Sequence, residues 1–179
     1  MSFFITRSQL KNYQNGVSLA NESVLPLQAK ATALNSYEAE VTLFLSHSHK
    51  DRDLIDPALA FLRSHGVKIY VDWMDEGMPD VVSGETAKIL KQRIQQQRKF
   101  LVLVTENSKD SRWVPCELGY ADPTKGMDHI AAFPVAETVD FIHNEYLKIY
   151  PKIQFVSNTW WVWRDDPQKL TQLPEWLRH

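Results

Sequence analysis

The sequence contains a single cysteine, Cys116, among its 179 residues, so no disulfide can form within the chain. This cysteine content gives no sign of secretion. No apolar run approaches the roughly 18 residues that a membrane-spanning helix needs. The apolar run at residues 3–5 is also too short for a signal peptide. We therefore expect a cytoplasmic protein with no membrane partner.

The sequence also has little net charge, with 20 basic and 22 acidic residues and a formal charge of -2. A protein that binds nucleic acid or an anionic membrane through charge carries a basic excess, which this composition lacks. No internal repeat or low-complexity segment is present. The 44% hydrophobic and 23% charged residues are ordinary for a globular protein, and the length suits one domain with a sizeable core.

Apolar runs rich in β-forming residues alternate with segments of helical periodicity. Strands are expected at 41–45, 67–71, 100–104 and 130–135, with a turn around Pro123 before the last of them. This alternation predicts a parallel sheet with right-handed crossovers. The expected fold is α/β and flavodoxin-like, with three layers around a central, mostly parallel five-stranded sheet. The strand order should be second, first, third, fourth, with a fifth strand at the edge.

The two ends of the chain give weaker signals. Residues 1–40 are interpreted as an N-terminal extension and residues 41–179 as the domain. Thr6 and Gln9 fit a capping box, which predicts the start of a helix. The extension either packs on the domain or serves as an oligomerisation element, and the sequence leaves both open. Residues 153–156 alternate in the manner of an edge strand.

The stretch after the third strand carries the candidate chemistry. Polar residues 105–108 favour a turn, and Ser111 can cap a short helix that tolerates Pro115 in its first turn. Trp113 and Glu117 are four residues apart, so they share one face of that helix. In open α/β sheets, ligands bind at the carboxyl ends of the strands, where this pair should lie. A surface glutamate that caps the helix, beside a half-buried tryptophan, accounts for the same spacing.

Other polar residues follow strands at the same edge. Ser46 and His49 come after the first strand, and Asp72 comes after the second. The predicted topology brings these side chains toward one crevice; alternatively, Ser46 lies in a plain turn and Asp72 caps its own loop. Cys116 is about 100° around the helix from Glu117 and is expected to be a core residue rather than a nucleophile.

A competing pattern, H-x-H-x-D, is formed by His47, His49 and Asp51. It is similar to the ligand spacing of metallo-β-lactamase-like hydrolases. Those proteins carry a histidine at the sixth position, where this chain has Arg52. Because a metal site needs a full ligand set, no metal is expected.

Several matches in a fixed order point to one family. They are SRWVPCEL at 111–118 after an apolar strand and a polar loop, FLSHS at 44–48, the loop 72–78 with Gly77, and the step 134–135. Together these residues resemble the Toll/interleukin-1 receptor (TIR) domain family, and the resemblance is clearest over residues 41–135. Members of the family often carry tyrosine and basic residues where this chain has His47 and His49.

The resemblance implies an activity. In the enzymatic branch of the family, a glutamate four residues after a tryptophan is the catalytic residue for NAD cleavage. This implies that Glu117 is catalytic and that Trp113 binds substrate. Ser46, His49 and Asp72 are then the further substrate-binding candidates. NAD+ would be the substrate, and no separate cofactor is expected.

The resemblance also implies a biological setting. Similar stand-alone bacterial proteins are NAD+ glycohydrolases that cleave the nicotinamide–ribose bond and make ADP-ribose or a cyclic ADP-ribose signal in anti-phage defence. Implied partners are further TIR domains, through the loop 72–84, and a downstream effector. The alternative is a non-catalytic TIR interaction or scaffold module that acts by self-association. Glu117 discriminates between the two, because adaptor-type members do not need a carboxylate there.

Overall fold

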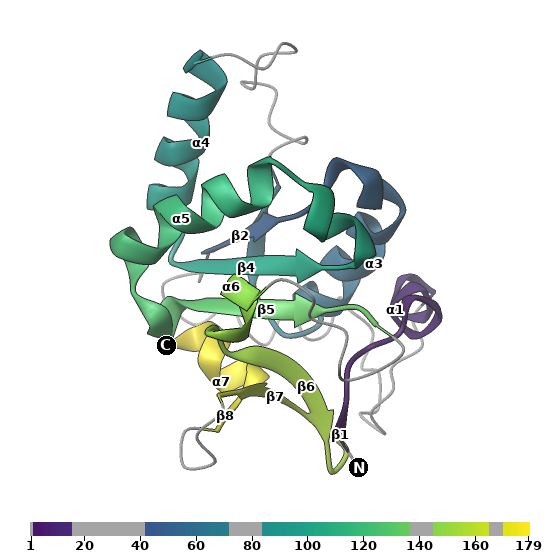
Figure 1. The fold of residues 1–179 in the computed structure, drawn as a ribbon. Coiled ribbons are helices and arrows are strands. Elements are labelled where there is room, and N and C mark those ends of the chain that lie inside the picture. The colour runs from purple at the N-terminus through teal and green to yellow at the C-terminus, as the bar shows by residue number, and fades with distance from the viewer. Residues whose placement is uncertain (1, 16–41, 72–83, 137–144, 165–169) are drawn as a thin grey trace.

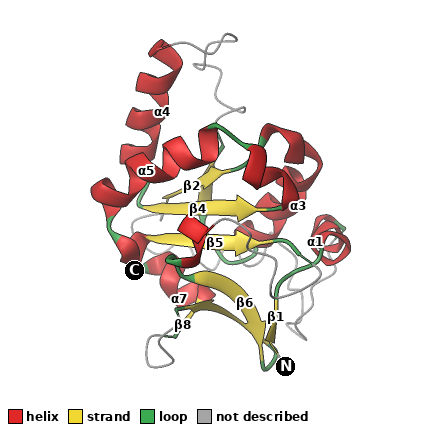
Figure 2. Ribbon diagram, in the orientation of Figure 1, coloured by secondary structure: helices red, strands yellow, loops and turns green. Residues whose placement is uncertain are grey.

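The expected alternation of strands and helices forms one sheet that carries helices on both faces (Figure 1, Figure 2). The computed structural model describes residues 2–15, 42–71, 84–136, 145–164 and 170–179. In chain order its elements are β1 (Ser2–Phe3), α1 (Arg7–Gln14), β2 (Thr42–Ser46), η1 (His49–Asp51), α3 (Arg52–Arg63), β3 (Lys68–Tyr70), α4 (Gly84–Gln96), β4 (Lys99–Val104), η3 (Glu106–Asp110), α5 (Trp113–Lys125), η4 (Met127–His129), β5 (Ile130–Pro134), α6 (Glu145–Lys148), β6 (Lys152–Val156), β7 (Thr159–Trp163), β8 (Thr171–Gln172) and α7 (Leu173–Arg178).

The sheet has the predicted strand order. Its strands follow the path β3-β2-β4-β5-β6-β7-β8, and β1 pairs with β6. The pairings from β3 through β6 are parallel, which confirms the flavodoxin-like α/β fold. Three antiparallel strands, β7, β8 and β1, extend this parallel part. The prediction that residues 153–156 form an edge strand is wrong, because β6 pairs with β5, β7 and β1.

The apolar runs form the central strands because both of their faces are covered. Every residue of β4 is buried. Side chains alternate between the faces of a strand, and the packing follows this period. In β2, Leu43 and Leu45 pack into one apolar cluster, while Phe44 packs into the other. Two clusters on opposite faces of one sheet make the three layers that the sequence predicts.

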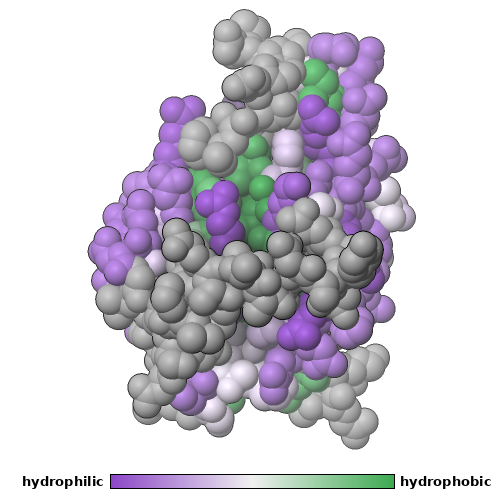
Figure 3. All heavy atoms as spheres, turned by 180° about the vertical axis from the view of Figure 1, so that it is seen from behind, coloured by the Kyte–Doolittle hydropathy of each residue, from purple (hydrophilic) through white to green (hydrophobic). Residues whose placement is uncertain are grey.

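Different helices cover the two faces. The first cluster joins the sheet to α1, α3 and α7, and the second joins it to α4 and α5. Seen from behind, the described surface is mostly hydrophilic, with hydrophobic side chains gathered near its centre (Figure 3). Within the described residues, no helix is long and apolar enough to cross a membrane.

One proline lies where the sequence predicted a turn. Pro123 is inside α5, which continues to Lys125 and ends at Gly126 with a φ of 75°. A proline within a helix costs one backbone hydrogen bond. Here it falls in the last turn, and the carboxyl end is instead closed by the amide of Gly126, which donates to the carbonyl of Asp122 at 3.0 Å.

The N-terminal residues 2–15 contribute to the same sheet and core. Strand β1 pairs with β6, and Ile5 forms an isolated parallel bridge with Val135, directly after β5. The predicted capping box then starts α1 at Thr6. Helix α1 packs on α3, where the ring of Tyr13 meets that of Phe61 edge-on at 5.0 Å. Residues 16–41 lie outside the described residues.

Candidate active site

Ser46 is the last residue of β2, and its position in the strand fixes the direction of its side chain. It continues the alternation of Phe44, which packs on the α4 and α5 side of the sheet. Its strand partner is Val102 of β4, whose side chain packs on that same side. The Ser46 hydroxyl is therefore presented to α5 at the carboxyl edge of the sheet, and the residue is 1% exposed.

Glu117 reaches the same place from α5. Val114, Leu118 and Ala121 form the buried face of this helix against the sheet. Glu117 lies on that face, three residues after Val114, and is 5% exposed. The alternative of a surface glutamate that caps the helix is wrong, because the carboxylate is buried.

The two side chains meet directly. Ser46 Oγ donates a hydrogen bond to Glu117 Oε2 at 2.5 Å. A buried carboxylate is costly unless hydrogen bonds replace its water. Helix α5 could satisfy its packing with an apolar residue at this position, as it does at Val114 and Leu118. A carboxylate held in an otherwise apolar layer is the kind of group that marks a functional site.

Trp113 lies one turn before Glu117 and is half-buried. Both residues line a groove between α4 and α5, together with six others. These are Ala87, Leu90, Lys91, Ile94, Cys116 and Tyr120. Cys116 is exposed in this groove rather than part of the core, so its predicted core role is wrong.

The other predicted binding residues lie in different surroundings. His49 opens η1 at the same edge and is exposed, with its ring 6.1 Å from that of the buried His47. The structure does not join His49 to the buried pair as it joins Ser46 to Glu117. Asp72 and residues up to 83 lie outside the described residues.

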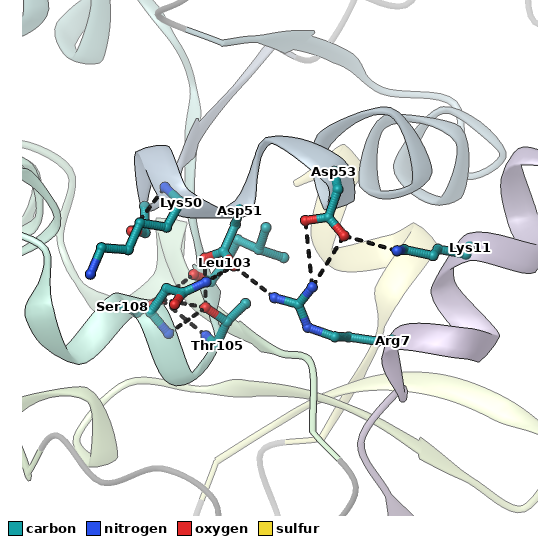
Figure 4. Close-up of polar contacts among 10 residues, drawn as sticks. Arg7, Lys11, Lys50, Asp51, Asp53, Leu103, Thr105 and Ser108 are labelled. Carbon is teal, nitrogen blue, oxygen red and sulfur yellow. Dashed lines mark hydrogen bonds and ion pairs between the residues drawn. The ribbon is translucent and has the colours of Figure 1, made fainter.

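Sequence reasoning gave no functional role to Asp51. Its side chain is fully buried and accepts hydrogen bonds from three others, as Figure 4 shows for Arg7 and Thr105. Oδ1 accepts from Arg7 Nη2 at 2.9 Å and from Asn107 Nδ2 at 2.7 Å, and Oδ2 accepts from Thr105 Oγ1 at 2.5 Å. Among the described residues, no cluster of three metal-binding side chains is found. The only signal for Asp51 was the H-x-H-x-D pattern, which suggested a different chemistry.

The comparison with known proteins adds to this geometry. A family model for the TIR domain matches residues 43–173. The chain belongs to the TIR domain family. The match runs from the second residue of β2 to the first residue of α7 and includes helix α5, which carries Trp113 and Glu117, so the resemblance seen in the motifs extends to most of the chain.

Two curated relatives carry activity names. A probable 3' cyclic ADP-D-ribose synthase of Bacillus cereus (strain MSX-D12) is 38% identical over 116 residues, which cover 62% of this chain and 59% of that protein. A putative cyclic ADP-D-ribose synthase of Cytobacillus dafuensis is 34% identical over 82 residues, covering 44% of this chain and 22% of that protein. The matches therefore span about three fifths of the first relative and about a fifth of the second.

Proposed function

We propose that this TIR-domain protein cleaves NAD+ at the nicotinamide–ribose bond, with Glu117 as its catalytic residue. The observation that carries the proposal is the buried Glu117 carboxylate, which accepts a hydrogen bond from Ser46. Glu117 is also one of the residues that line the groove beside Trp113. The names of the two relatives support the same reaction class, since a cyclic ADP-ribose is formed from NAD+ by loss of nicotinamide.

The chemistry of this bond suits a single carboxylate. Cleavage builds positive charge on the ribose, as in glycoside hydrolysis, where a carboxylate faces the reacting carbon. The leaving group is a pyridinium cation that departs as neutral nicotinamide, so no acid is needed to protonate it. Glu117 then stabilises the developing charge or orients the attacking hydroxyl, and such electrostatic stabilisation often contributes more to catalysis than any other effect.

The neighbouring residues support this role. Ser46 donates to one carboxylate oxygen and so fixes its orientation. Trp113 offers a ring face to the cationic nicotinamide or to the ribose. His49, exposed at the rim, and Asp72 remain candidates for binding the ribose hydroxyls or the phosphates.

The nucleophile decides the product. Attack by water gives ADP-ribose, nicotinamide and a proton, whereas attack by a hydroxyl of the same nucleotide gives a cyclic ADP-ribose, nicotinamide and a proton. We propose that the product is a signal of bacterial anti-phage defence, read by a downstream effector. Self-association through the loop 72–84 would assemble the enzyme, and NAD+ would act as substrate without a further cofactor.

The test is NAD+ consumption by the purified full chain at high protein concentration, with products identified by mass. Wild type is compared with Glu117→Ala and with Glu85→Ala. Glu85 is an exposed glutamate at the start of α4, paired with Lys88 at 3.4 Å, and serves as the matched control. We expect loss of NAD+ with wild type and Glu85→Ala, and none with Glu117→Ala.

Two results would count against the proposal. Undiminished turnover in Glu117→Ala would show that the catalytic residue is assigned wrongly. Absence of turnover in concentrated wild-type protein, with and without a crowding agent, would favour the non-catalytic interaction module. The product mass separates hydrolysis from cyclisation in the active case.

A further inference from the structure

Asp51 joins three parts of the chain that are distant in sequence. It is the last residue of η1, five residues after Ser46, and its backbone amide donates to the carbonyl of Ser48 at 2.8 Å. Its carboxylate accepts from Thr105 and Asn107, which follow β4, and from Arg7, the first residue of α1. A fully buried carboxylate with three side-chain donors is strongly restrained in position.

The Thr105 segment leads directly to Glu117. The Thr105 amide donates to Ser108 Oγ at 3.0 Å, and Ser108 Oγ donates to the carbonyl of Leu103 at 2.9 Å (Figure 4). The amide of Ser111 then donates to the carbonyl of Ser108 at 3.2 Å, and Ser111 Oγ accepts from the amide of Val114 at 3.3 Å. Hydrogen bonds therefore connect each turn between the end of β4 and the first turn of α5 to the turn before it.

Asp51 therefore holds together residues 46–51 and residues 105–117, the two segments that carry Ser46 and Glu117. We call these contacts of Asp51 the clamp. The η1 side is continuous with Ser46, and the Thr105 side is continuous with Glu117. A shift of one segment against the other would lengthen the 2.5 Å contact between Ser46 Oγ and Glu117 Oε2. Misplacement of a catalytic group by about 1 Å can cost about 100-fold in rate.

Arg7 reaches the clamp from an anchored segment. The amide of Ala136 donates to the carbonyl of Ile5 at 2.9 Å, which holds the chain just before α1 beside the end of β5. Arg7 Nη2 binds Asp51 at 2.9 Å, and Arg7 Nη1 binds Asp53 at 3.2 Å. Lys11, one turn later, binds Asp53 at 2.8 Å (Figure 4).

We propose that Asp51 is a positioning residue for the Ser46–Glu117 pair, and that Arg7 makes helix α1 a required part of the working site. This inference rests on the proposed NAD+ cleavage. It assigns a function to the N-terminal residues that the family model, which begins at residue 43, does not include.

The experiment measures kcat, KM and thermal stability for Asp51→Asn, Arg7→Gln and Arg7→Lys in the full chain. Asparagine keeps the shape of Asp51 but brings an N–H donor into a site filled with donors. We expect kcat to fall about 10- to 100-fold in Asp51→Asn and about 5- to 10-fold in Arg7→Gln. KM should change less than about threefold, because the pair acts in the transition state. Arg7→Lys should recover most of the loss in Arg7→Gln.

Lys11→Gln is the matched control, since it removes a contact to Asp53 from the same helix without touching Asp51. Its kcat should equal that of wild type. The proposal is overturned if Arg7→Gln keeps wild-type kcat, or if it loses activity only in proportion to the unfolded fraction. Arg7→Gln keeps the test valid even where Asp51→Asn fails to fold, because Arg7 is 43% exposed.

A second measurement separates this proposal from the proposed activity. Amide hydrogen exchange should quicken in residues 105–118 of Arg7→Gln, but not in β6 and β7. This result supports the clamp even for a chain that does not turn over NAD+. Unchanged exchange in residues 105–118 overturns it, whatever the activity.

Discussion

The two edges of the sheet both bury charge, but with opposite sign. At the carboxyl edge, Glu117 and Asp51 are buried carboxylates that accept from hydroxyl and N–H donors at the ends of β2 and β4 and in η3. At the amino edge, Lys99 begins β4 and is 2% exposed. Its Nζ donates to the carbonyl of Asp128 at 3.2 Å and lies 4.5 Å from the centre of the Trp176 ring.

The difference lies in what covers each charge. Glu117 is one of the residues that line the groove between α4 and α5. Lys99 is instead covered by Trp176 of α7, whose Nε1 donates to the same Asp128 carbonyl at 2.9 Å. Burial, together with the nearby charge of Arg98, lowers the pKa of Lys99 to about 8. The two buried charges therefore differ in their surroundings, since Glu117 belongs to the lining of a groove and Lys99 is covered by α7.

The largest expected effect is a loss of NAD+ turnover when the buried charge at the carboxyl edge is removed. Glu117→Gln keeps the size of the side chain but removes its charge. Turnover of NAD+ should fall on the order of 1000-fold, because transition-state stabilisation is lost. Its free energy of unfolding should equal or exceed that of wild type, since a buried charge is removed. Kinetics and urea unfolding on the same preparation check both parts.

Lys99→Met makes the matching change at the other edge. It should leave turnover unchanged and raise the free energy of unfolding by about 1–3 kcal/mol, because an apolar side chain replaces a buried ammonium. If Lys99→Met abolished NAD+ cleavage in a folded protein, the contrast between the edges would be wrong.

The next effect tests the hydrogen bond to Glu117. Ser46→Ala removes the donor to Oε2 and leaves the carboxylate less restrained. Since a hydrogen bond to a charged group contributes about 1.5–3 kcal/mol, we expect kcat to fall about 10- to 100-fold. Ser64→Ala is a suitable control, because Ser64 Oγ donates to the carbonyl of Phe61 within the same helix turn. Equal kcat for both variants would remove Ser46 from the mechanism.

Much of this arrangement follows from local patterns in the sequence. The apolar runs at β2, β4 and β5 predicted buried parallel strands, and their order followed from the rules for α/β connections. The four-residue spacing predicted that Trp113 and Glu117 share one helix face. In the structure both residues line the groove between α4 and α5. Alternation along β2 also carries enough information to place Ser46 on the α5 side.

The remaining features depend on contacts that a local pattern does not encode. Arg7 and Asp51 are 44 residues apart, and each looks like an ordinary surface residue of a helix start. Residues 153–156 alternate between buried and half-buried, and this alternation is the same as that of an edge strand. Cys116 is exposed and lines the groove between α4 and α5. Its position in the sequence of α5 does not show that α4 leaves this groove open.

A smaller effect concerns pH and the amino edge. Because the pKa of Lys99 is lowered from 10.5 to about 8, the unfolded chain binds a proton between these values that the folded chain has released. Stability should therefore rise with pH through this window. From pH 7.5 to 9.5, wild type should gain about 1–2 kcal/mol relative to Lys99→Met. Tyr150, whose pKa burial raises to about 12, opposes this trend only above about pH 10.

Urea unfolding of both proteins at the two pH values gives this difference directly. Using the difference between wild type and Lys99→Met cancels the titration of groups that both proteins share. Parallel curves for the two proteins would mean that the Lys99 ammonium is better solvated than its 2% exposure indicates.

The smallest effect belongs to an exposed pair beside Lys99. Arg164 hydrogen-bonds the carboxylate of Asp128, whose side chain is 81% exposed, and this bond lowers the pKa of Asp128. The Arg164 side chain is 29% exposed, but the Asp128 carboxylate lies in water, so water and salt screen the pair. Arg164→Gln should therefore cost less than about 0.5 kcal/mol at neutral pH. The cost should fade in 1 M salt, where the screening length is about 3 Å. It should also fade as the pH falls through the lowered pKa of Asp128, because protonation removes the charge.

A loss above about 1 kcal/mol that persists in salt would contradict this prediction. It would show that Arg164 acts instead on the buried contacts of Lys99, and that exposed and buried charges at this edge form one network.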